Sequence, residues 1–118
     1  MIIDNDRDVT SLLAALLSLK GYKIYKSFNS AEAITKLHEI KEKVDVIILD
    51  GRIAMEEGGM IISRIKQINS DIKIFTVAEN ITDRANLLKI GSDNFAIKPI
   101  SAESIVDIVS QIVMNKVS

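Results

Sequence analysis

The chain has 118 residues, and the length, a hydrophobic content of 47% and a charged content of 26% together indicate one compact domain and exclude a disordered chain. The net charge of −1 gives no support for binding nucleic acid or an anionic membrane through bulk charge. Cysteine is absent, which excludes disulfides and thiolate sites. No apolar run reaches the roughly 18 residues of a membrane span, and no signal peptide is present. We therefore expect a cytoplasmic protein with no direct contact with nucleic acid or membrane.

The first part of the chain predicts a strand, a helix and a second strand. The short apolar run Met1–Ile3 ends at the polar triplet Asp4, Asn5 and Asp6. The helix that follows carries apolar residues at spacings of three and four, and Gly21 is its stop signal. These apolar residues are Val9, Leu12, Leu13, Leu16, Leu17 and Leu19. The alternating stretch Tyr22–Lys26 predicts a half-buried strand.

The middle of the chain predicts two helices on either side of a buried strand. Ser30 is the expected cap of a helix with Ala33, Ile34, Leu37 and Ile40 on one face. In the stretch Val44–Asp50, an uninterrupted apolar run leads directly to Asp50, which favours a strand covered on both faces. An irregular loop ending at Gly58 and Gly59 then precedes a helix over Met60–Ile68.

The last part predicts two strands and two helices. Ile72–Val77 is the fourth strand, and a short helix runs from Thr82 or Asp83 to Lys89 before Gly91. Phe95–Ile97 is a brief fifth strand leading into Lys98 and Pro99, and a cis bond before this proline is one way to shape the edge. Ser101 is the expected cap of the last helix, whose apolar face holds Ile105, Val106, Ile108, Val109, Ile112 and Val113.

Strand and helix therefore alternate five times. Right-handed crossovers favour an α/β fold with a five-stranded, doubly wound parallel sheet and helices on both faces. In the flavodoxin-like order 2-1-3-4-5, the first and third strands are neighbours. Asp4, Asn5 or Asp6 would then lie close to Asp50. We expect residues 1–118 to form this single domain with no output domain. Because the first strand is short, whether a longer natural chain starts before Met1 is left open.

Carboxylates that meet at one sheet edge repel each other and need a cation or protons. Mg²⁺ suits such a site, since it takes a few carboxylate and carbonyl oxygens and leaves room for a phosphate oxygen. Lys98, at the end of the fifth strand, would add positive charge for a phosphoryl group. A simpler interpretation of Asp4 and Asp6 is capping of the first helix, which is compatible with metal binding.

Over essentially its whole length the chain resembles the receiver domain of two-component response regulators. The resemblance lies in Ile3–Asp6, in Ile47–Asp50 and in Gly91–Pro99, which match the family in type and order. It implies that Asp50 accepts a phosphoryl group from a sensor histidine kinase or phosphotransfer protein with Mg²⁺ bound. It also implies that Lys98 contacts the phosphoryl oxygens and that Phe95 is the aromatic switch residue, although an ordinary core role suits Phe95 as well.

The sequence departs from the family at three places. The acid pair contains Asn5, whose amide has an oxygen but no charge. The Ser or Thr expected at the end of the fourth strand falls on Thr76, Val77 or Ala78, and we favour Val77 or Ala78, which removes the switch hydroxyl. The usual Met-Pro pair after Asp50 is replaced by Ile53 and Ala54.

Arg52 occupies the position whose backbone carbonyl completes the family's metal site. Its guanidinium would either replace part of the metal's charge or pair with Asp50 and block the site. The metal ligands implied by the resemblance are thus Asp4, Asn5, Asp6, Asp50 and the Arg52 carbonyl.

Two functions remain open. The first is a stand-alone receiver, a signalling phosphoprotein and not an enzyme, whose downstream protein binds the fourth helix, the fifth strand and the last helix, as in the family. The alternative is a pseudo-receiver, an interaction module that is not phosphorylated. A flavodoxin-like cofactor protein is less well supported, because the acids after the first strand would repel a flavin phosphate.

Overall fold

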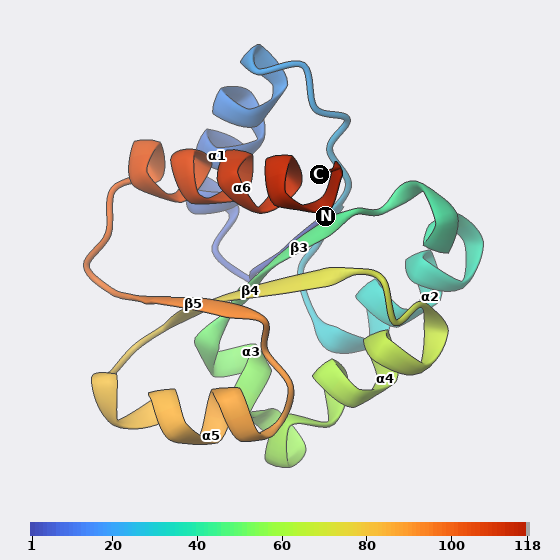
Figure 1. Cartoon of the computed structure of the whole chain (residues 1–118), viewed down its shortest axis with the longest axis vertical. Coiled ribbons are helices and arrows are strands. Elements are labelled where there is room, and N and C mark those ends of the chain that lie inside the picture. The colour runs from blue at the N-terminus through green and yellow to red at the C-terminus, as the bar shows by residue number, and fades with distance from the viewer. Residues whose placement is uncertain (118) are drawn as a thin grey trace.

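The five strands form one parallel sheet in the order β2-β1-β3-β4-β5, which confirms the predicted fold. The structure is a computed structural model that describes residues 1–117, with side chains through residue 116 (Figure 1). The strands are β1 (Ile2–Ile3), β2 (Lys26–Ser27), β3 (Val46–Asp50), β4 (Lys73–Ala78) and β5 (Asn94–Ile97).

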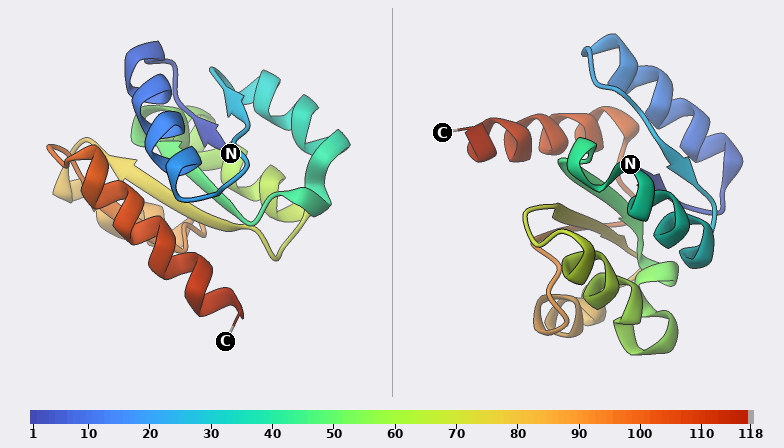
Figure 2. Two further views of the ribbon diagram at one scale, coloured as in Figure 1. Left: turned by 90° about the horizontal axis from the view of Figure 1, so that it is seen from above. Right: turned by 90° about the vertical axis from the view of Figure 1, so that its right-hand side faces the viewer.

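Helices cover both faces of the sheet (Figures 1 and 2). On one face lie α1 (Arg7–Leu19) and α6 (Ala102–Val117). The other face carries α2 (Ser30–Ile40), α3 (Gly51–Met55), α4 (Met60–Ile68) and α5 (Arg84–Lys89). None of these described helices is long and apolar enough to cross a membrane.

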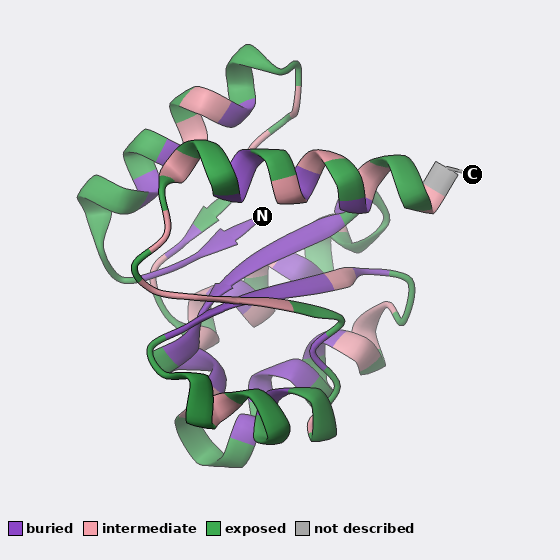
Figure 3. Ribbon diagram, turned by 60° about the vertical axis from the view of Figure 1, so that its left-hand side comes forward, coloured by how far each residue is buried: buried purple, intermediate pink, exposed green. Residues whose placement is uncertain are grey.

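The central strand β3 is buried along its whole length, as the apolar run before Asp50 predicts (Figure 3). Its side chains alternate between two core clusters. Ile47 and Leu49 pack toward α2 and α4, whereas Val46 and Ile48 pack toward α1 and α6. Asp50 is therefore held at the end of a strand that is buried along its whole length.

Two predicted elements differ from the observed ones near β2. The strand expected over Tyr22–Lys26 is regular only at Lys26 and Ser27, because β1 is a short neighbour and pairs through Ile2 and Ile3 alone. The cap of α2 is Asn29, whose side chain accepts from Glu32 N at 2.8 Å, so Ser30 is the first helical residue. At α6 the expected cap is present, since Ser101 Oγ accepts from Ser104 N at 3.1 Å.

The loop expected after Asp50 contains structure that the sequence pattern does not reveal. Residues 51–55 form α3, and a 3-10 turn over Glu56–Gly59 leads into α4. Glu57, Gly58 and Gly59 have φ values of 50°, 67° and 86°, all in the left-handed region. A Cβ on Gly59 would lie 2.4 Å from Ile90 Cδ1, so glycine is required where this turn packs against the end of α5.

Candidate functional site

The acids predicted to converge do meet at the carboxyl edge of the sheet. Ile3 of β1 is in register with Leu49 of β3, so the residues that follow, Asp4 and Asp50, end neighbouring strands. Asp4 is 7% exposed and Asp50 is 2% exposed. Two carboxylates are thus buried beside each other at the switch point of the sheet.

Two cations face the Asp50 carboxylate. Lys98 Nζ donates to Asp50 Oδ1 at 2.8 Å, and Arg52 Nε donates to Oδ2 at 3.3 Å. The Lys98 backbone is fixed at the end of β5, where its N–H donates to the Ala78 carbonyl at 2.8 Å and its bond to Pro99 is cis. Asp50 therefore has charge compensation from both sides within the protein.

Glu79 is a member of this site that sequence reasoning missed. Its Oε1 accepts from Lys98 Nζ at 2.7 Å and lies 3.5 Å from Arg52 Nε. The available signal was its place directly after β4, the strand between β3 and β5. Glu79 closes a cluster in which two carboxylates share the two cations.

The charges of the cluster shift the acid–base behaviour of its members. Partial burial opposes the charged form of Lys98, but hydrogen bonds to Asp50 and Glu79 outweigh it and raise the lysine pKa. The charge of Asp50, and then its hydrogen bond, raise the pKa of the Arg52 guanidinium. Burial raises the pKa of Asp4, a hydrogen bond from the Asp6 backbone opposes this, and the nearby Asp50 charge adds to it.

The three polar residues after β1, Asp4, Asn5 and Asp6, have different surroundings. Asp4 Oδ1 accepts from Asp6 N at 2.9 Å, and Asp6 Oδ1 caps α1 by accepting from Asp8 N and Val9 N at 3.0 and 3.1 Å. Asn5 is exposed. The capping interpretation of Asp6 is therefore what the structure displays.

A divalent cation has fewer charged ligands here than a three-acid site offers. Within residues 1–116, no group of three or more His, Cys, Asp or Glu side chains is placed to hold a metal ion. The charge of Asp50 nevertheless raises the pKa of the buried Asp4, and a cation beside the two carboxylates would relieve this repulsion. These donors fit Mg²⁺, which keeps several waters when protein ligands are few.

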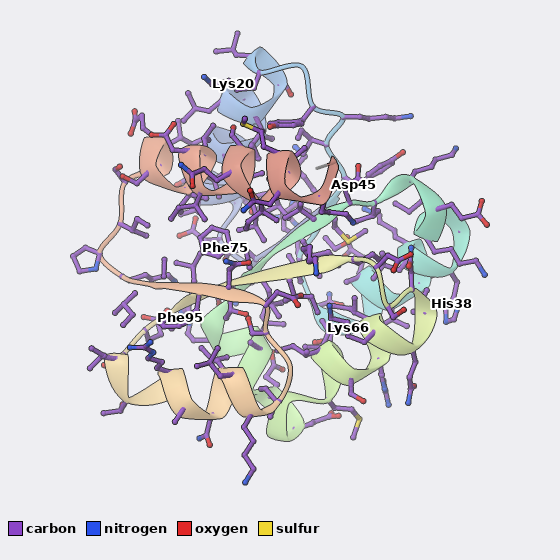
Figure 4. The ribbon with its side chains drawn as sticks, viewed as in Figure 1. Lys20, His38, Asp45, Lys66, Phe75 and Phe95 are labelled. Carbon is purple, nitrogen blue, oxygen red and sulfur yellow. The ribbon has the colours of Figure 1, made fainter. Side chains whose placement is uncertain are left out.

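The expected switch positions lie along β4 and β5. Val77 is in register with Asp50, and Ala78 is the last residue of β4. The Thr76 hydroxyl is 2.8 Å from Ser92 Oγ, so it is engaged away from Asp50. Phe95 lies between β5 and α5 (Figure 4), is partly buried, and has the Arg84 guanidinium 5.2 Å from its ring centroid.

Gly51 brings α3 unusually close to β4. A Cβ at this position would lie 2.8 Å from both the Val77 carbonyl oxygen and the Ala78 Cα. Ile53 and Ala54, which replace the Met-Pro pair expected after Asp50, are buried in the core. The segment after Asp50 therefore packs backbone to backbone against the end of β4.

Comparison with known proteins gives one consistent family. A model of the response regulator receiver domain matches residues 1–110. The probable transcriptional regulator ycf27 of Cyanidium caldarium is 30% identical over 103 residues, which cover 86% of this chain and 40% of that protein. CpxR of Escherichia coli (strain K12), a transcriptional regulatory protein, is 24% identical over 107 residues, or 90% of this chain and 45% of CpxR. The chain thus spans less than half the length of these relatives.

Solved structures agree with the fold. A two-component response regulator from Clostridium difficile is 29% identical with a TM-score of 0.82, and the match covers 99% of this chain and 96% of that one. A response regulator protein from Burkholderia pseudomallei, solved with a phosphorylated aspartic acid, calcium ion and citrate, is 24% identical with a TM-score of 0.75 over 93% of this chain and 69% of that one. Because the family model spans most of the chain and the sheet order agrees, the chain belongs to the response regulator receiver domain family.

Proposed function

We propose that this receiver domain accepts a phosphoryl group on Asp50 from the phosphohistidine of a sensor kinase or phosphotransfer protein. Receiver domains are signalling modules, and this one would act by protein contact once modified. The observation that carries the proposal is the buried Asp50 carboxylate with Lys98 Nζ at 2.8 Å. A carboxylate aligned with a fixed ammonium provides both a nucleophile and a cation for the incoming phosphoryl oxygens.

In the proposed step, an Asp50 oxygen attacks phosphorus as the P–N bond to the donor imidazole breaks. The bonding pair returns to the imidazole nitrogen, and an acyl phosphate forms on Asp50. Lys98 would leave its ion pair with Asp50 and bind the new phosphoryl oxygens, since its flexible side chain already lies beside the carboxylate that would carry them. Water would later take the phosphoryl group, which releases inorganic phosphate and restores the Asp50 carboxylate.

Asp4, Asp50 and the Arg52 backbone carbonyl would hold Mg²⁺, which supplies positive charge to the phosphoryl oxygens when bound. Asn5 and Asp6, which follow Asp4, would be further oxygen donors. With two close carboxylates instead of three, we expect Mg²⁺ affinity to be modest.

The test is modification by a small phosphodonor. The chain is incubated with Mg²⁺ and acetyl phosphate, and the phosphoryl adduct is followed by intact mass, with Asp50→Asn as the control. The proposal predicts one adduct that depends on Asp50 and disappears when Mg²⁺ is chelated. Absence of an adduct at saturating donor would contradict it, as would an equal adduct in Asp50→Asn.

The ion pairs around Asp50 favour a second candidate, the pseudo-receiver. Lys98 and Arg52 already compensate the charge of Asp50. Both cations also pair with Glu79, which would compete with a phosphoryl group for them. An unmodified interaction module with this arrangement would bind no Mg²⁺ at millimolar concentration in calorimetry. Millimolar or tighter binding, together with an adduct on Asp50, would decide against it.

We propose that the downstream partner is a protein that binds the face formed by α5, β5 and α6. Leu88 of α5 is 48% exposed, and β5 is an edge strand with half-buried residues. Phosphorylation would reach this face through Lys98, whose backbone leads directly from β5. We propose further that this domain works in the cytoplasm and makes no direct contact with nucleic acid or membrane.

A further inference from the structure

A groove of about 450 Å³ lies between α2 and α4, in the layer of helices that covers one face of the sheet. The residues that line it on the side of α2 and the 3-10 turn after α2 are Ile34, His38 and Lys41, and those on the side of α4 are Arg64, Gln67 and Ile68. In Figure 1 the two helices are neighbours, and Figure 4 shows His38 at the outer margin of the molecule. None of these residues belongs to the Asp50 cluster, so the groove is a separate feature of the fold.

The two walls of the groove are held together by the fold. Residues 34, 38 and 41 follow one another at intervals of four and three, which places them on one side of α2. At one end of the groove, Asn69 Nδ2 donates to the Lys41 carbonyl at 2.9 Å. Because this bond joins the end of α4 to the end of α2, the spacing between the walls does not depend on a ligand.

The rim of the groove is basic. Lys41 and Arg64 carry full positive charges, His38 adds a third when it is protonated, and no acid is among the six lining residues. Within residues 1–116, the side chains of these three residues have no ion pair or hydrogen bond. By contrast, Lys66 and Lys98 each pair with a carboxylate. The charge of this rim is therefore left without compensation by the described residues.

The helix dipole explains only part of this rim. His38 lies in the last turn of α2 and Lys41 directly after it, where cations stabilise the partial negative charge of the helix end. Arg64 lies in the middle of α4, one turn after Met60, which is 41% exposed. The dipole therefore does not account for the charge on the α4 wall.

The floor of the groove is aliphatic. Ile34 and Ile68 are partly buried and pack against the core cluster beneath α2 and α4. None of the six lining residues is Phe, Tyr or Trp. Single-stranded nucleic acid binds largely by stacking its bases on such rings, so this floor suits an aliphatic side chain better than a base. The volume falls within the roughly 300–1,000 Å³ of binding clefts.

We propose that this groove binds an acidic segment of a partner protein, in which one aliphatic side chain lies between carboxylates. The aliphatic side chain packs on Ile34 and Ile68. The carboxylates on its two sides pair with Lys41 on one wall and with Arg64 on the other. The inference goes beyond phosphorylation at Asp50 and does not rest on it.

The test is an NMR titration of the isotope-labelled full chain with the peptide Glu-Asp-Leu-Glu-Asp, acetylated and amidated at its ends, at low ionic strength. We expect saturable shifts of the amides of His38, Lys41, Arg64 and Gln67. Arg64→Gln and Lys41→Gln should each raise the Kd about two- to fivefold, because each removes one exposed ion pair. Lys20→Gln, at an exposed lysine after α1 and outside the groove, is the matched control and should leave the Kd unchanged.

Two altered peptides separate the floor from the rim. Ser in place of Leu should raise the Kd at least about threefold, since the aliphatic contact is lost. Gln and Asn in place of Glu and Asp should abolish the shifts. Equal binding of either altered peptide would overturn the proposal, as would an unchanged Kd in both Arg64→Gln and Lys41→Gln.

Two other anions test the class of partner. Inorganic phosphate and a single-stranded oligonucleotide with the same charge as the peptide are titrated separately under the same conditions. Both should bind more weakly than the peptide, because neither places an aliphatic side chain on the floor. A Kd for phosphate as low as that of the peptide would reduce the groove to a general anion site, and tighter binding of the oligonucleotide would make nucleic acid its occupant. Either result would overturn the assignment to a protein segment.

Discussion

Asp50 lies between the cations of Lys98 and Arg52, and the Glu79 carboxylate pairs with the same two cations. Lys98 contacts both Asp50 and Glu79 within 2.8 Å, and Arg52 lies within 3.5 Å of each. The cluster is electrically balanced without any bound ion. Each partner therefore affects both the stability of the site and its availability to a phosphoryl group.

Removing the lysine should destabilise the fold, because the Asp50 side chain is fully buried. We expect Lys98→Met to lower the free energy of unfolding by about 1–3 kcal/mol, less than for a fully buried pair because Lys98 is partly exposed. Denaturant unfolding measures this. Asp50→Asn combined with Lys98→Met should recover most of the loss, and a double variant no more stable than Lys98→Met would contradict the coupling.

Neutralising Glu79 should make Asp50 more reactive, since Lys98 and Arg52 then have one acceptor fewer. Glu79 and Arg52 are partly exposed, so solvent weakens the effect. We expect Glu79→Gln to speed modification by acetyl phosphate roughly two- to fivefold. Glu103→Gln, on the exposed first turn of α6, is the matched control, and equal rates for the two variants would count against the role of Glu79.

Asp4 should cost stability when it is ionised. Burial raises its pKa, so the folded state holds the proton more tightly than the unfolded state, and stability is lost as pH rises from about 4 through the folded pKa. Asp4→Asn keeps an oxygen for the Asp6 N–H and should raise the free energy of unfolding at pH 7 without Mg²⁺, but leave it unchanged at pH 3. Unfolding at both pH values, with exposed Asp8→Asn as control, checks this. A gain that is equal at both would exclude ionisation as its cause.

Sequence reasoning placed Asp50 and Lys98 at one edge because both follow predicted parallel strands. It missed Glu79 because a carboxylate after a strand is ordinary, and its meeting with Lys98 depends on side-chain conformations that no spacing encodes. Asp6 was left between capping and metal binding for the same reason. Strand order determines which residues are neighbours, whereas their hydrogen bonds depend on the packed backbone.

Among the elements, those with strong periodicity were predicted well. The apolar run of β3 and the helix over Met60–Ile68 agree with the structure. The strand expected at Tyr22–Lys26 is mostly irregular, because regularity there depends on a neighbour and β1 is short. The turn at Gly58 and Gly59 was predicted as the end of a loop, but the left-handed conformation of Glu57 within it was not, since a glutamate gives no sign of it.

That turn gives a prediction for Glu57, a non-glycine residue with a φ of 50°. Glu57→Gly should raise the free energy of unfolding by about 0.5–1 kcal/mol, because glycine adopts this conformation without a Cβ penalty. Exposed Glu56, with a φ of −60°, is the matched control, and Glu56→Gly should be neutral or destabilising. Denaturant unfolding of both variants distinguishes them, and a loss of stability in Glu57→Gly would contradict the assigned strain.

On the scale of the whole molecule, the two edges of the sheet have different roles. Charged side chains gather at the carboxyl edge, around Asp50. At the amino-terminal edge, β1 begins beside a cavity of about 130 Å³ that both apolar and charged residues line. The chain also spans less than half the length of its curated relatives.

The buried amine of Met1 predicts how the whole fold responds to pH. Its pKa is about 5 in the folded state against 8.0 ordinarily, so between these values the unfolded state holds the extra proton. Stability should therefore rise with pH across this window, by about 2–4 kcal/mol. Chemical denaturation at pH 5, 6, 7 and 8 measures the slope. N-terminal acetylation should flatten it, and an unchanged slope after acetylation would assign the effect to other groups.

The pairing of Thr76 with Ser92, beside a valine in register with Asp50, has one further consequence. Exchanging neighbours, by Thr76→Val with Val77→Thr, yields an isomer of the protein with the same mass, charge and composition. Ser92 keeps the Asn94 carbonyl as an acceptor at 2.8 Å, so its buried hydroxyl stays satisfied. The hydroxyl oxygen would move from residue 76, where it contacts Ser92, to residue 77, which is in register with Asp50. Because the two proteins have the same composition, any difference in their signalling would come from the position of that hydroxyl oxygen alone.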